Sequence, residues 1–408
     1  MPDCSASNVA RSAFLPTQSQ PLNGQTTSVF KLWAPDFRLV FLEMLTSADS
    51  TPRQEGPKNI LMLKAHSAGV GDLLRSSAAW RGLKNRFPQT RLHLWFLTKD
   101  PASISRELIS RHHLLASFHV TDKRSGSGGG WGFLLSEARA LAASLKPELI
   151  IDFEPNGFRT SALAWKLGRY TPAKTVGIAQ VPLRRFFYGR AAASTQKYAQ
   201  LHGMNWPLEY AERDFVALAA LGIERQGTAI ELEETEEGRR FRELLKREAG
   251  ADSRRPILGL NIGCGTPDAV WKRPNLRLMA GLVEELQRRH GFALVLTGAP
   301  YEQAINREFL AGYHPEGTVL DLAGRTTLLQ LTGAIAACRL FLSSDSGPYH
   351  MAVALRVPTL AVFNRPNPEH YHHHDWVDCR VAPDEHTLPK LVDSAEKLLR
   401  LTSLPATL

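Results

Sequence analysis

The chain has 408 residues, which is more than one hydrophobic core usually serves, so we expect two domains. Hydrophobic residues make up 43% and charged residues 22%, which excludes a disordered chain, and no apolar run approaches the roughly 18 residues of a membrane span. The net charge of +9 favours an anionic partner such as a nucleotide, a phosphorylated glycolipid or a membrane surface. Because no block of Lys and Arg is interleaved with aromatic residues, we do not expect nucleic acid to bind.

The amino-terminal segment differs in composition from the rest. Residues 1–56 are rich in Ser, Thr, Gln, Asn and Pro and predict a mobile tail. An apolar island within it, at 37–45, fits either a short amphipathic helix that touches a membrane or a strap packed on the first domain. The start has no basic segment followed by an apolar one, so secretion is not indicated. The four cysteines form no CxxC pair and no metal-ligand spacing, which favours a reduced, cytoplasmic setting.

From residue 59 onward, short apolar runs alternate with helical stretches. The predicted strands of the first half lie at 60–65, 91–97, 116–122 and 148–153. Helices are expected at 71–87 and 133–146, with a glycine-rich loop at 125–132. This alternation predicts a parallel sheet covered by helices on both faces.

A polar, charged stretch at 231–256 then reads as a solvated helix followed by an interdomain linker. The alternation restarts beyond it, with predicted strands at 257–263, 292–298, 318–324, 339–345 and 358–363 and a last helix at 388–401. The fold class is therefore α/β, with two Rossmann-like domains at 57–240 and 241–408, and the last helix is able to pack back on the first domain. Ligands in such folds bind beyond the carboxyl ends of the strands.

In the first domain, the segment HSAGVGD follows the first strand and places Asp72 at a helix start. The small residues let the backbone approach a ligand closely, so Asp72 is a candidate catalytic group. The alternative is that an acidic residue there only caps the helix and complements its dipole. The glycine spacing is not GxGxxG and no acidic residue ends the second strand, so a dinucleotide site is poorly supported.

In the second domain, three strand ends carry candidate groups. CGTPDAVWK leads to Lys272, APYE to Glu302, and SDSGPYH to Ser346, Gly347 and His350. A helix N-terminus with small residues is an anion site, and a lysine is suited to a phosphate. Singly, each fits a bland role, namely a surface lysine, a helix cap or a half-buried histidine. Together, at successive ends of one sheet, they favour a nucleotide-diphosphate site.

These motifs resemble glycosyltransferase family nine, the heptosyltransferases of lipopolysaccharide core assembly, which have the GT-B fold. The resemblance covers roughly 59–368 and is strongest in DLAGRTTLLQLTGAIAACRLFLSSDSGPYHMAVALRVPTLAVFNRPNP, at 321–368. GVGDLLRSSAAWRGLKNRFP is similar to the family's amino-terminal motif, and IDFEPNGFRTSALAWKLGR to its "lDlqg–lrSal" segment. The resemblance implies an acceptor domain followed by a nucleotide-sugar donor domain.

The resemblance also implies roles for individual residues. Asp72 matches the general base, Lys272 the lysine on the diphosphate, and Asp345 the acid beside the transferred sugar. Glu302 matches the acid that holds the ribose. The other implied donor-binding residues are Gly265, Thr266, Thr326, Thr327, Ser346, Gly347 and His350. The implied reaction is an inverting displacement with an ADP-sugar as co-substrate, without a cofactor and without a metal.

For the acceptor, the expected contacts are Gly71, Arg75, Arg184 and Arg185, whose positive charge fits phosphates on a glycolipid or simply a solvated face. Such an acceptor implies a cytoplasmic enzyme with peripheral contact at the inner membrane. Two sequence runs require comment, one that departs from the family's motif and one that is rich in histidine. The family's Lys-Arg-Trp-Pro run is WKRPNL here, and the histidines of YHHHDW are interpreted as a loop near the cleft and not as a metal site. Three alternatives stay open: a transferase using a UDP-linked sugar, a nucleotide-sugar epimerase, and a non-catalytic nucleotide-sugar binder.

Overall fold

The computed structural model describes residues 56–65, 69–99, 105–123, 130–252, 254–264 and 267–401, all within one compact unit, Gly56–Leu408. The tail expected over residues 1–56 therefore lies, apart from Gly56, outside the described residues, and so does most of the loop expected at 125–132. Among the described helices, none is both long and apolar enough to span a bilayer.

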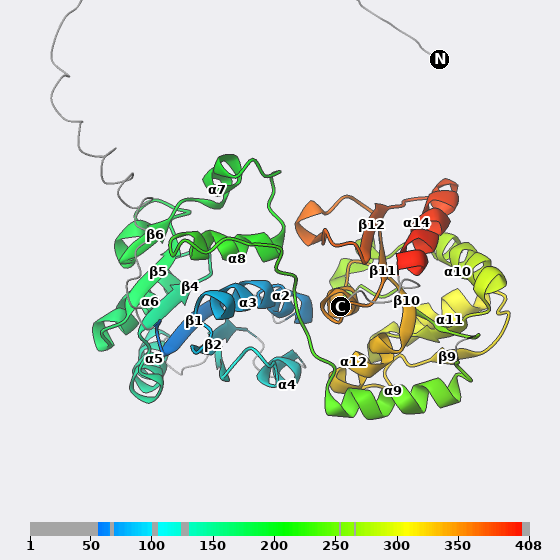
Figure 1. Ribbon diagram of the computed structural model, residues 1–408, viewed down its shortest axis with the longest axis horizontal. Helices are drawn as coiled ribbons and strands as arrows, with labels where there is room; N and C mark the ends of the chain where they lie inside the picture. Colours follow the sequence, from blue (N-terminus) through cyan, green and yellow to red (C-terminus); the bar gives the residue numbers. More distant parts are fainter. Residues whose placement is uncertain are drawn as a thin grey trace, which may run out of the picture. The chain divides into compact units, whose positions relative to one another are not determined.

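The first half of the described chain forms a six-stranded parallel sheet in the order β3-β2-β1-β4-β5-β6 (Figure 1). Its strands are β1 Asn59–Ala65, β2 Arg91–Thr98, β3 Ser117–Asp122, β4 Leu149–Asp152, β5 Lys174–Ile178 and β6 Arg190–Ala192. The central strands are predominantly apolar and almost fully buried, as expected for a sheet covered on both faces.

The helices of this half are α2 Val70–Leu74, α3 Ser77–Arg86, α4 Ser105–Ser110, α5 Trp131–Leu145, α6 Arg159–Tyr170, η1 Arg184–Phe187, α7 Thr195–Leu201 and α8 Tyr210–Ala219. The helical stretch predicted over 71–87 is present, but it is divided into α2 and α3. Ser77 Oγ donates a hydrogen bond to the Leu74 carbonyl oxygen at 2.6 Å, and this local bond competes with a continuous helical ladder.

The second half forms another six-stranded parallel sheet, in the order β12-β11-β10-β7-β8-β9. Its strands are β7 Ile257–Asn261, β8 Ala293–Leu296, β9 Val319–Asp321, β10 Cys338–Ser343, β11 Thr359–Phe363 and β12 Val377–Val381. Its helices are η2 Pro267–Lys272, α10 Leu276–His290, η3 Pro300–Glu302, α11 Gln303–Ala311, α12 Leu328–Ala336, α13 Gly347–Ala354, η4 Pro368–His370, η5 Glu385–Thr387 and α14 Leu388–Leu401. The predicted α/β class with two Rossmann-like sheets is confirmed.

Two details differ from the sequence-based expectation. Helix α9, Glu236–Glu248, packs along α12 of the second sheet, so the expected boundary at 240/241 falls inside a helix that is not simply solvated. A Cβ on Gly333 would lie 1.9 Å from the Gly238 carbonyl oxygen, which shows how closely the two backbones approach. The last helix, α14, packs on α10 and on β10, β11 and β12, so its main contacts are with the second sheet instead of the first domain.

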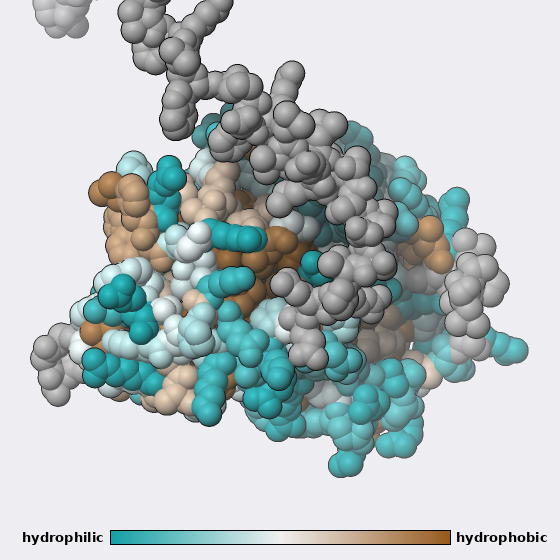
Figure 2. Space-filling view, turned by 60° about the vertical axis from the view of Figure 1, so that its left-hand side comes forward, coloured by the Kyte–Doolittle hydropathy of each residue, from teal (hydrophilic) through white to brown (hydrophobic). Residues whose placement is uncertain are grey.

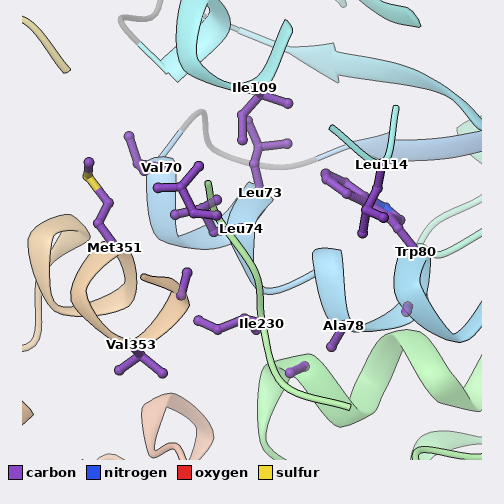
Figure 3. Close-up of a cluster of buried hydrophobic side chains, with 14 of the residues drawn as sticks. Val70, Leu73, Leu74, Ala78, Trp80, Ile109, Leu114, Ile230, Met351 and Val353 are labelled. Carbon is purple, nitrogen blue, oxygen red and sulfur yellow. The ribbon is translucent and has the colours of Figure 1, made fainter. Parts of the chain in front are cut away.

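The connection order reverses between β1 and β4 in the first sheet and between β7 and β10 in the second. Such switch points leave a crevice beyond the carboxyl ends of the strands, where doubly wound folds bind ligands. Helix α2 follows β1 and α13 follows β10, and these two helices pack on each other. Figure 3 shows the apolar side chains at this junction, with Val70 and Leu74 of α2 near Met351 of α13.

Candidate active site

The second switch point gathers a lysine, a carboxylate and a histidine. Asp345 follows β10 and its side chain is buried. Lys272 Nζ, at the end of η2, lies 3.0 Å from Asp345 Oδ2, and Asn367 Nδ2 donates to the same oxygen at 2.8 Å. His370 Nδ1 lies 2.6 Å from Asp345 Oδ1. Burial alone would favour the neutral acid, but His370 and then Lys272 outweigh it and lower the pKa of Asp345 to about 2. The group is therefore an anion at any physiological pH.

The residues that open α13 lie beside this carboxylate. Ser346 is the N-cap and Gly347 the first helical residue. Ser346 Oγ donates to Asn261 Oδ1 of β7 at 2.8 Å, which ties the start of α13 to the neighbouring strand. The helix start is thus held at the switch point with its backbone N–H groups directed toward the crevice, an arrangement that favours an anion.

His350, one turn into α13, is buried and joins the two halves of the structure. A Cβ on Gly71 of α2 would lie 2.2 Å from His350 Cδ2, so only a glycine fits there. His350 Nδ1 lies 2.9 Å from His372 Nε2, and His372 Nδ1 lies 3.0 Å from Glu209 Oε1 at the start of α8. Burial lowers the pKa of both histidines, to which nearby Arg75 adds, so both are neutral near pH 7. As a neutral imidazole, His372 donates from Nδ1 to the Glu209 carboxylate and accepts at Nε2 a hydrogen bond from His350 Nδ1.

A pocket lies at the switch point of the first sheet. It has a volume of about 90 Å³ and is lined in part by Asp72, Arg75, Glu154, Asn156 and Tyr210. Asp72 of α2 is partly exposed and forms an ion pair with Arg75, whose guanidinium stacks on the Tyr210 ring at 4.1 Å. The pocket therefore holds both a carboxylate and positive charge.

Glu154 was not singled out by the sequence analysis, although it lines the same pocket. Its Oε1 accepts a hydrogen bond from the Ala65 backbone N–H at 2.8 Å. Burial raises its pKa to about 7, with Asp152 and Asp214 adding to the rise while Lys64 opposes it. Lys64 is itself held by Asp214, 2.9 Å away. Glu154 is thus a carboxyl group able to exchange a proton near neutral pH.

The remaining predicted donor residues lie in different surroundings. Glu302 is buried, and its two oxygens accept hydrogen bonds from the backbone N–H groups of Cys264 at 2.9 Å and Ala299 at 2.8 Å. It therefore fixes the loops that follow β7 and β8. Thr327 caps α12 and donates to Glu237 of α9 at 3.1 Å. Thr326, half-buried, precedes it, and Gly265 and Thr266 lie outside the described residues.

Arg184 requires a correction. Its side chain is 0% exposed, as is that of Asp152, and the two form an ion pair at 2.9 Å. Arg184 also donates to Ser161 Oγ at 2.8 Å, and the Tyr188 hydroxyl donates to Asp152 at 2.7 Å. An acceptor contact by Arg184 is therefore contradicted, since the guanidinium is enclosed within the first domain. Arg185, the next residue, is exposed.

One group in the described residues has the geometry to hold a metal ion. One ligand atom each from Asp345, His350 and His370 lies within 4.8 Å of the others. Asp345 already carries Lys272 and Asn367, and His350 Nδ1 is engaged by His372. The charge of the lysine opposes a divalent ion at this carboxylate, so the donor set fits an anion site better than a metal site.

His370, which ends η4, and the histidines of the YHHHDW run that follows it divide their roles by position. His370 meets Asp345 and His372 meets His350, whereas His374 stacks on Trp376 with ring centroids 4.5 Å apart. We expected the run to lie near the cleft but predicted no role for His370, His372 or His374. The alternate spacing of histidines is the signal that could have found them, because residues two apart in an extended loop face the same side.

Two Rossmann-like sheets whose switch points meet through α2 and α13 have the arrangement of the GT-B fold. The sequence profile described as glycosyltransferase family 9 (heptosyltransferase) matches residues 188–390. The chain belongs to this family, and it is a glycosyltransferase.

Three comparisons illustrate the similarity. Lipopolysaccharide heptosyltransferase 2 of Salmonella typhimurium is 27% identical over 314 residues, covering 74% of this chain and 81% of that one. The family 9 glycosyl transferase of Veillonella parvula has a TM-score of 0.65 at 20% identity, covering 84% of this chain and 97% of that one. The ADP-heptose LPS heptosyltransferase II of E. coli has a TM-score of 0.61 at 21% identity, covering 85% and 100%.

Proposed function

We propose that this chain transfers heptose from ADP-heptose to a lipopolysaccharide core-like acceptor. The observation that carries the proposal is the contact between Gly71 of α2 and His350 of α13, because it sets the Asp72 pocket against the crevice of Lys272 and Asp345. Donor and acceptor chemistry are supported by relatives, since the Salmonella typhimurium protein is a lipopolysaccharide heptosyltransferase and the E. coli structure is that of an ADP-heptose LPS heptosyltransferase.

The donor's diphosphate is assigned to Lys272 and the start of α13. A lysine is a compact point charge suited to phosphate, and the backbone N–H groups at Gly347 add the positive end of the helix dipole. These groups stabilise the negative charge that grows on ADP as the bond from its phosphate oxygen to the anomeric carbon breaks. Asp345 faces the transferred sugar, and the hydrogen bonds from His370 and Asn367 keep its carboxylate oriented.

Asp72 is assigned as the base that takes the proton of the attacking acceptor hydroxyl. Its ion pair with Arg75 favours the charged carboxylate, which makes it a weak base. Proton transfer therefore follows late, once the new bond to the anomeric carbon has made the hydroxyl acidic. Attack from the side opposite to the leaving ADP inverts the anomeric configuration.

No divalent ion takes part in the proposed mechanism. Lys272 and the N-terminus of α13 place positive charge at the leaving group. A metal ion has this role in other transferases. We expect the rate to be unchanged by EDTA. A rate that falls with EDTA and returns with one added metal ion would instead favour the group of Asp345, His350 and His370 as a metal site.

The test is release of ADP from ADP-heptose, with and without a lipopolysaccharide core acceptor. We expect release only with acceptor, and Asp72→Asn is expected to lower kcat by about 10²–10⁴-fold, the usual contribution of a general base. Asp393→Asn, on the exposed face of α14, is the matched control and keeps full activity. Turnover of the donor without acceptor would favour an epimerase, and unchanged transfer by Asp72→Asn would refute the base assignment.

Two further outcomes separate the remaining alternatives. Transfer from a UDP-linked sugar but not from ADP-heptose would keep the reaction class and change the donor. Binding of a nucleotide sugar without any turnover would identify a non-catalytic binder. The proposed place of action is the cytoplasmic face of the inner membrane, where a lipid-linked acceptor is accessible.

A further inference from the structure

One stretch of the first domain has an unusual charge pattern. Between Glu154 and Glu209 the sequence contains no Asp or Glu at all. The same stretch has eight basic residues, namely Arg159, Lys166, Arg169, Lys174, Arg184, Arg185, Arg190 and Lys197. Of these only Arg184 is buried. On α9, by contrast, the exposed Arg239 and Arg240 both pair with Glu236.

Large apolar side chains are exposed on the same elements. Phe186 of η1 is 72% exposed, and Leu183 just before it is 65% exposed. Phe158, which precedes α6, is 48% exposed, and Trp165 of α6 is 39% exposed. We call the surface formed by Phe158, Trp165, Lys166, Arg169, Leu183, Arg185 and Phe186 the α6–η1 face.

The members of this face are neighbours in space. Helix α6 and η1 pack on each other, and the rings of Phe158 and Phe187 lie 6.1 Å apart. Phe158 and Trp165 are seven residues apart, about two helical turns, so they project from the same side. Figure 2 brings forward the side of the molecule on which Figure 1 labels α6, and apolar surface is exposed there beside hydrophilic side chains.

Cations and aromatic rings are paired within the face. The Lys166 Nζ lies 5.0 Å from the Trp165 ring centroid, and the Arg169 guanidinium carbon lies 5.7 Å from it. The Arg185 guanidinium carbon lies 5.8 Å from the Phe186 ring centroid. Aromatic rings flanked by basic groups fit the boundary between lipid headgroups and acyl chains, where the rings insert and the cations meet phosphates.

The face also adjoins the Asp72 pocket along the chain. Asn156 lines that pocket, and Phe158 is only two residues further on. A lipid seated at the face would therefore carry its sugar headgroup toward Asp72. A protein partner would be expected to contribute acidic side chains to so basic a surface, but it would not explain the closeness of the Asp72 pocket.

We propose that the α6–η1 face docks on an anionic lipid surface and presents the lipid-linked acceptor to the Asp72 pocket. The second part rests on the proposed function, since only a lipid-linked acceptor requires such presentation. The first part stands on charge and exposed apolar surface alone. Phe186 and Trp165 provide insertion, and Lys166, Arg169 and Arg185 provide attraction to acidic headgroups.

The experiment is co-sedimentation of the full chain with vesicles. We expect binding to phosphatidylglycerol-containing vesicles and little binding to pure phosphatidylcholine vesicles. The variants Lys166→Gln and Arg169→Gln are each expected to weaken binding about fivefold, and Phe186→Ser with Trp165→Ser to weaken it at least as much. The matched controls lie on α9, where Arg240→Gln and Leu244→Ser remove an exposed base and a 42% exposed leucine and are expected to leave binding unchanged.

The outcomes separate this inference from the proposed function. Equal binding to neutral vesicles, no binding to either kind, or variants that bind as the wild type would overturn the docking surface while leaving transfer to a lipid-free core oligosaccharide intact. Vesicle binding without any transfer would overturn the proposed function, and with it the presentation of an acceptor, but it would leave the docking surface intact. A change in sedimentation coefficient of the free protein on Phe186→Ser would show that the face joins two copies of the chain, which also overturns the lipid assignment.

Discussion

Arg184 and Arg185 are adjacent in the chain but have opposite surroundings. Arg184 is enclosed with Asp152, while Arg185 is exposed on η1. We expect Arg184→Met to lower the free energy of unfolding by about 3–5 kcal/mol, because it leaves the Asp152 carboxylate buried without its cation. Arg185→Met is the control and is expected to change it by less than about 0.5 kcal/mol. Urea unfolding of both variants measures the difference, and equal effects would contradict the burial of Arg184.

Ionisation of Glu154 makes the stability of the protein depend on pH, and the sign of this dependence follows from the pKa of Glu154. Its pKa is about 7 in the folded protein, above the ordinary value of 4.5, so the unfolded chain ionises first. The wild type therefore loses stability relative to Glu154→Gln as the pH rises from about 4.5 to about 7. We expect Glu154→Gln to be more stable by about 1–3 kcal/mol at pH 8.5 and nearly equal at pH 4.5. Unfolding midpoints at the two pH values test this, and a constant difference would show that Glu154 is not perturbed.

Some residues of the candidate site could be singled out from the sequence and others could not. Lys272 and Asp345 stand at strand ends, where the chain order alone places ligand-binding groups. His370 ends the short helix η4 and His372 lies in the irregular loop after it, and the path of both depends on which side chains they meet. The prediction of Arg184 as an acceptor contact was wrong because an arginine in a basic stretch is expected to be exposed. Its carboxylate partner lies 32 residues earlier in the chain.

At the scale of elements, the contact between α2 and α13 depends on one glycine. A Cβ on Gly71 would lie 2.2 Å from His350 Cδ2, so the two helices would have to separate. We expect Gly71→Ala to destabilise the protein by about 1–3 kcal/mol and to lower kcat, because Asp72 moves with α2. Gly132→Ala in α5 is the control, since a Cβ there meets nothing within 4 Å and alanine favours a helix. Full activity of Gly71→Ala would contradict the role of this junction.

The same scale shows which elements a sequence predicts well. The central strands β1, β2, β7 and β10 are predominantly apolar, because both faces of a parallel sheet are covered, and all were expected. The edge strands β6 and β12 were not predicted. Strand β6 has only three residues, and both strands are partly exposed. Helix α9 was taken for a solvated helix because its charged residues hide the side that packs on α12 through Gly238.

At the scale of the whole described unit, polar contacts join the two halves of the structure, in addition to the apolar contact between α2 and α13. Glu209, which caps the start of α8, meets His372, and Arg213 of α8 meets Glu369. Within the first half, Arg225 supports this link by pairing with Glu209 at 2.9 Å. The carboxylate of Glu209 is held ionised against its burial by His372 and Arg225, which lower its pKa to about 2. The sequence predicted two domains and a cleft, but not these contacts, because every pair joins residues that are distant in the chain or belong to different elements.

The central claim is that the crevice of Lys272 and Asp345 binds the ADP part of an ADP-sugar. The most direct measurement is thermal stabilisation by ADP, ADP-heptose, UDP-N-acetylglucosamine and GDP-mannose, for the wild type, Lys272→Ala and the exposed control Lys390→Ala. A ligand at about 100 times its dissociation constant adds roughly 2.7 kcal/mol of stability. We predict a shift with ADP and ADP-heptose alone, kept by Lys390→Ala and lost by Lys272→Ala. A shift only with UDP- or GDP-linked ligands, or an ADP shift unchanged in Lys272→Ala, would contradict it.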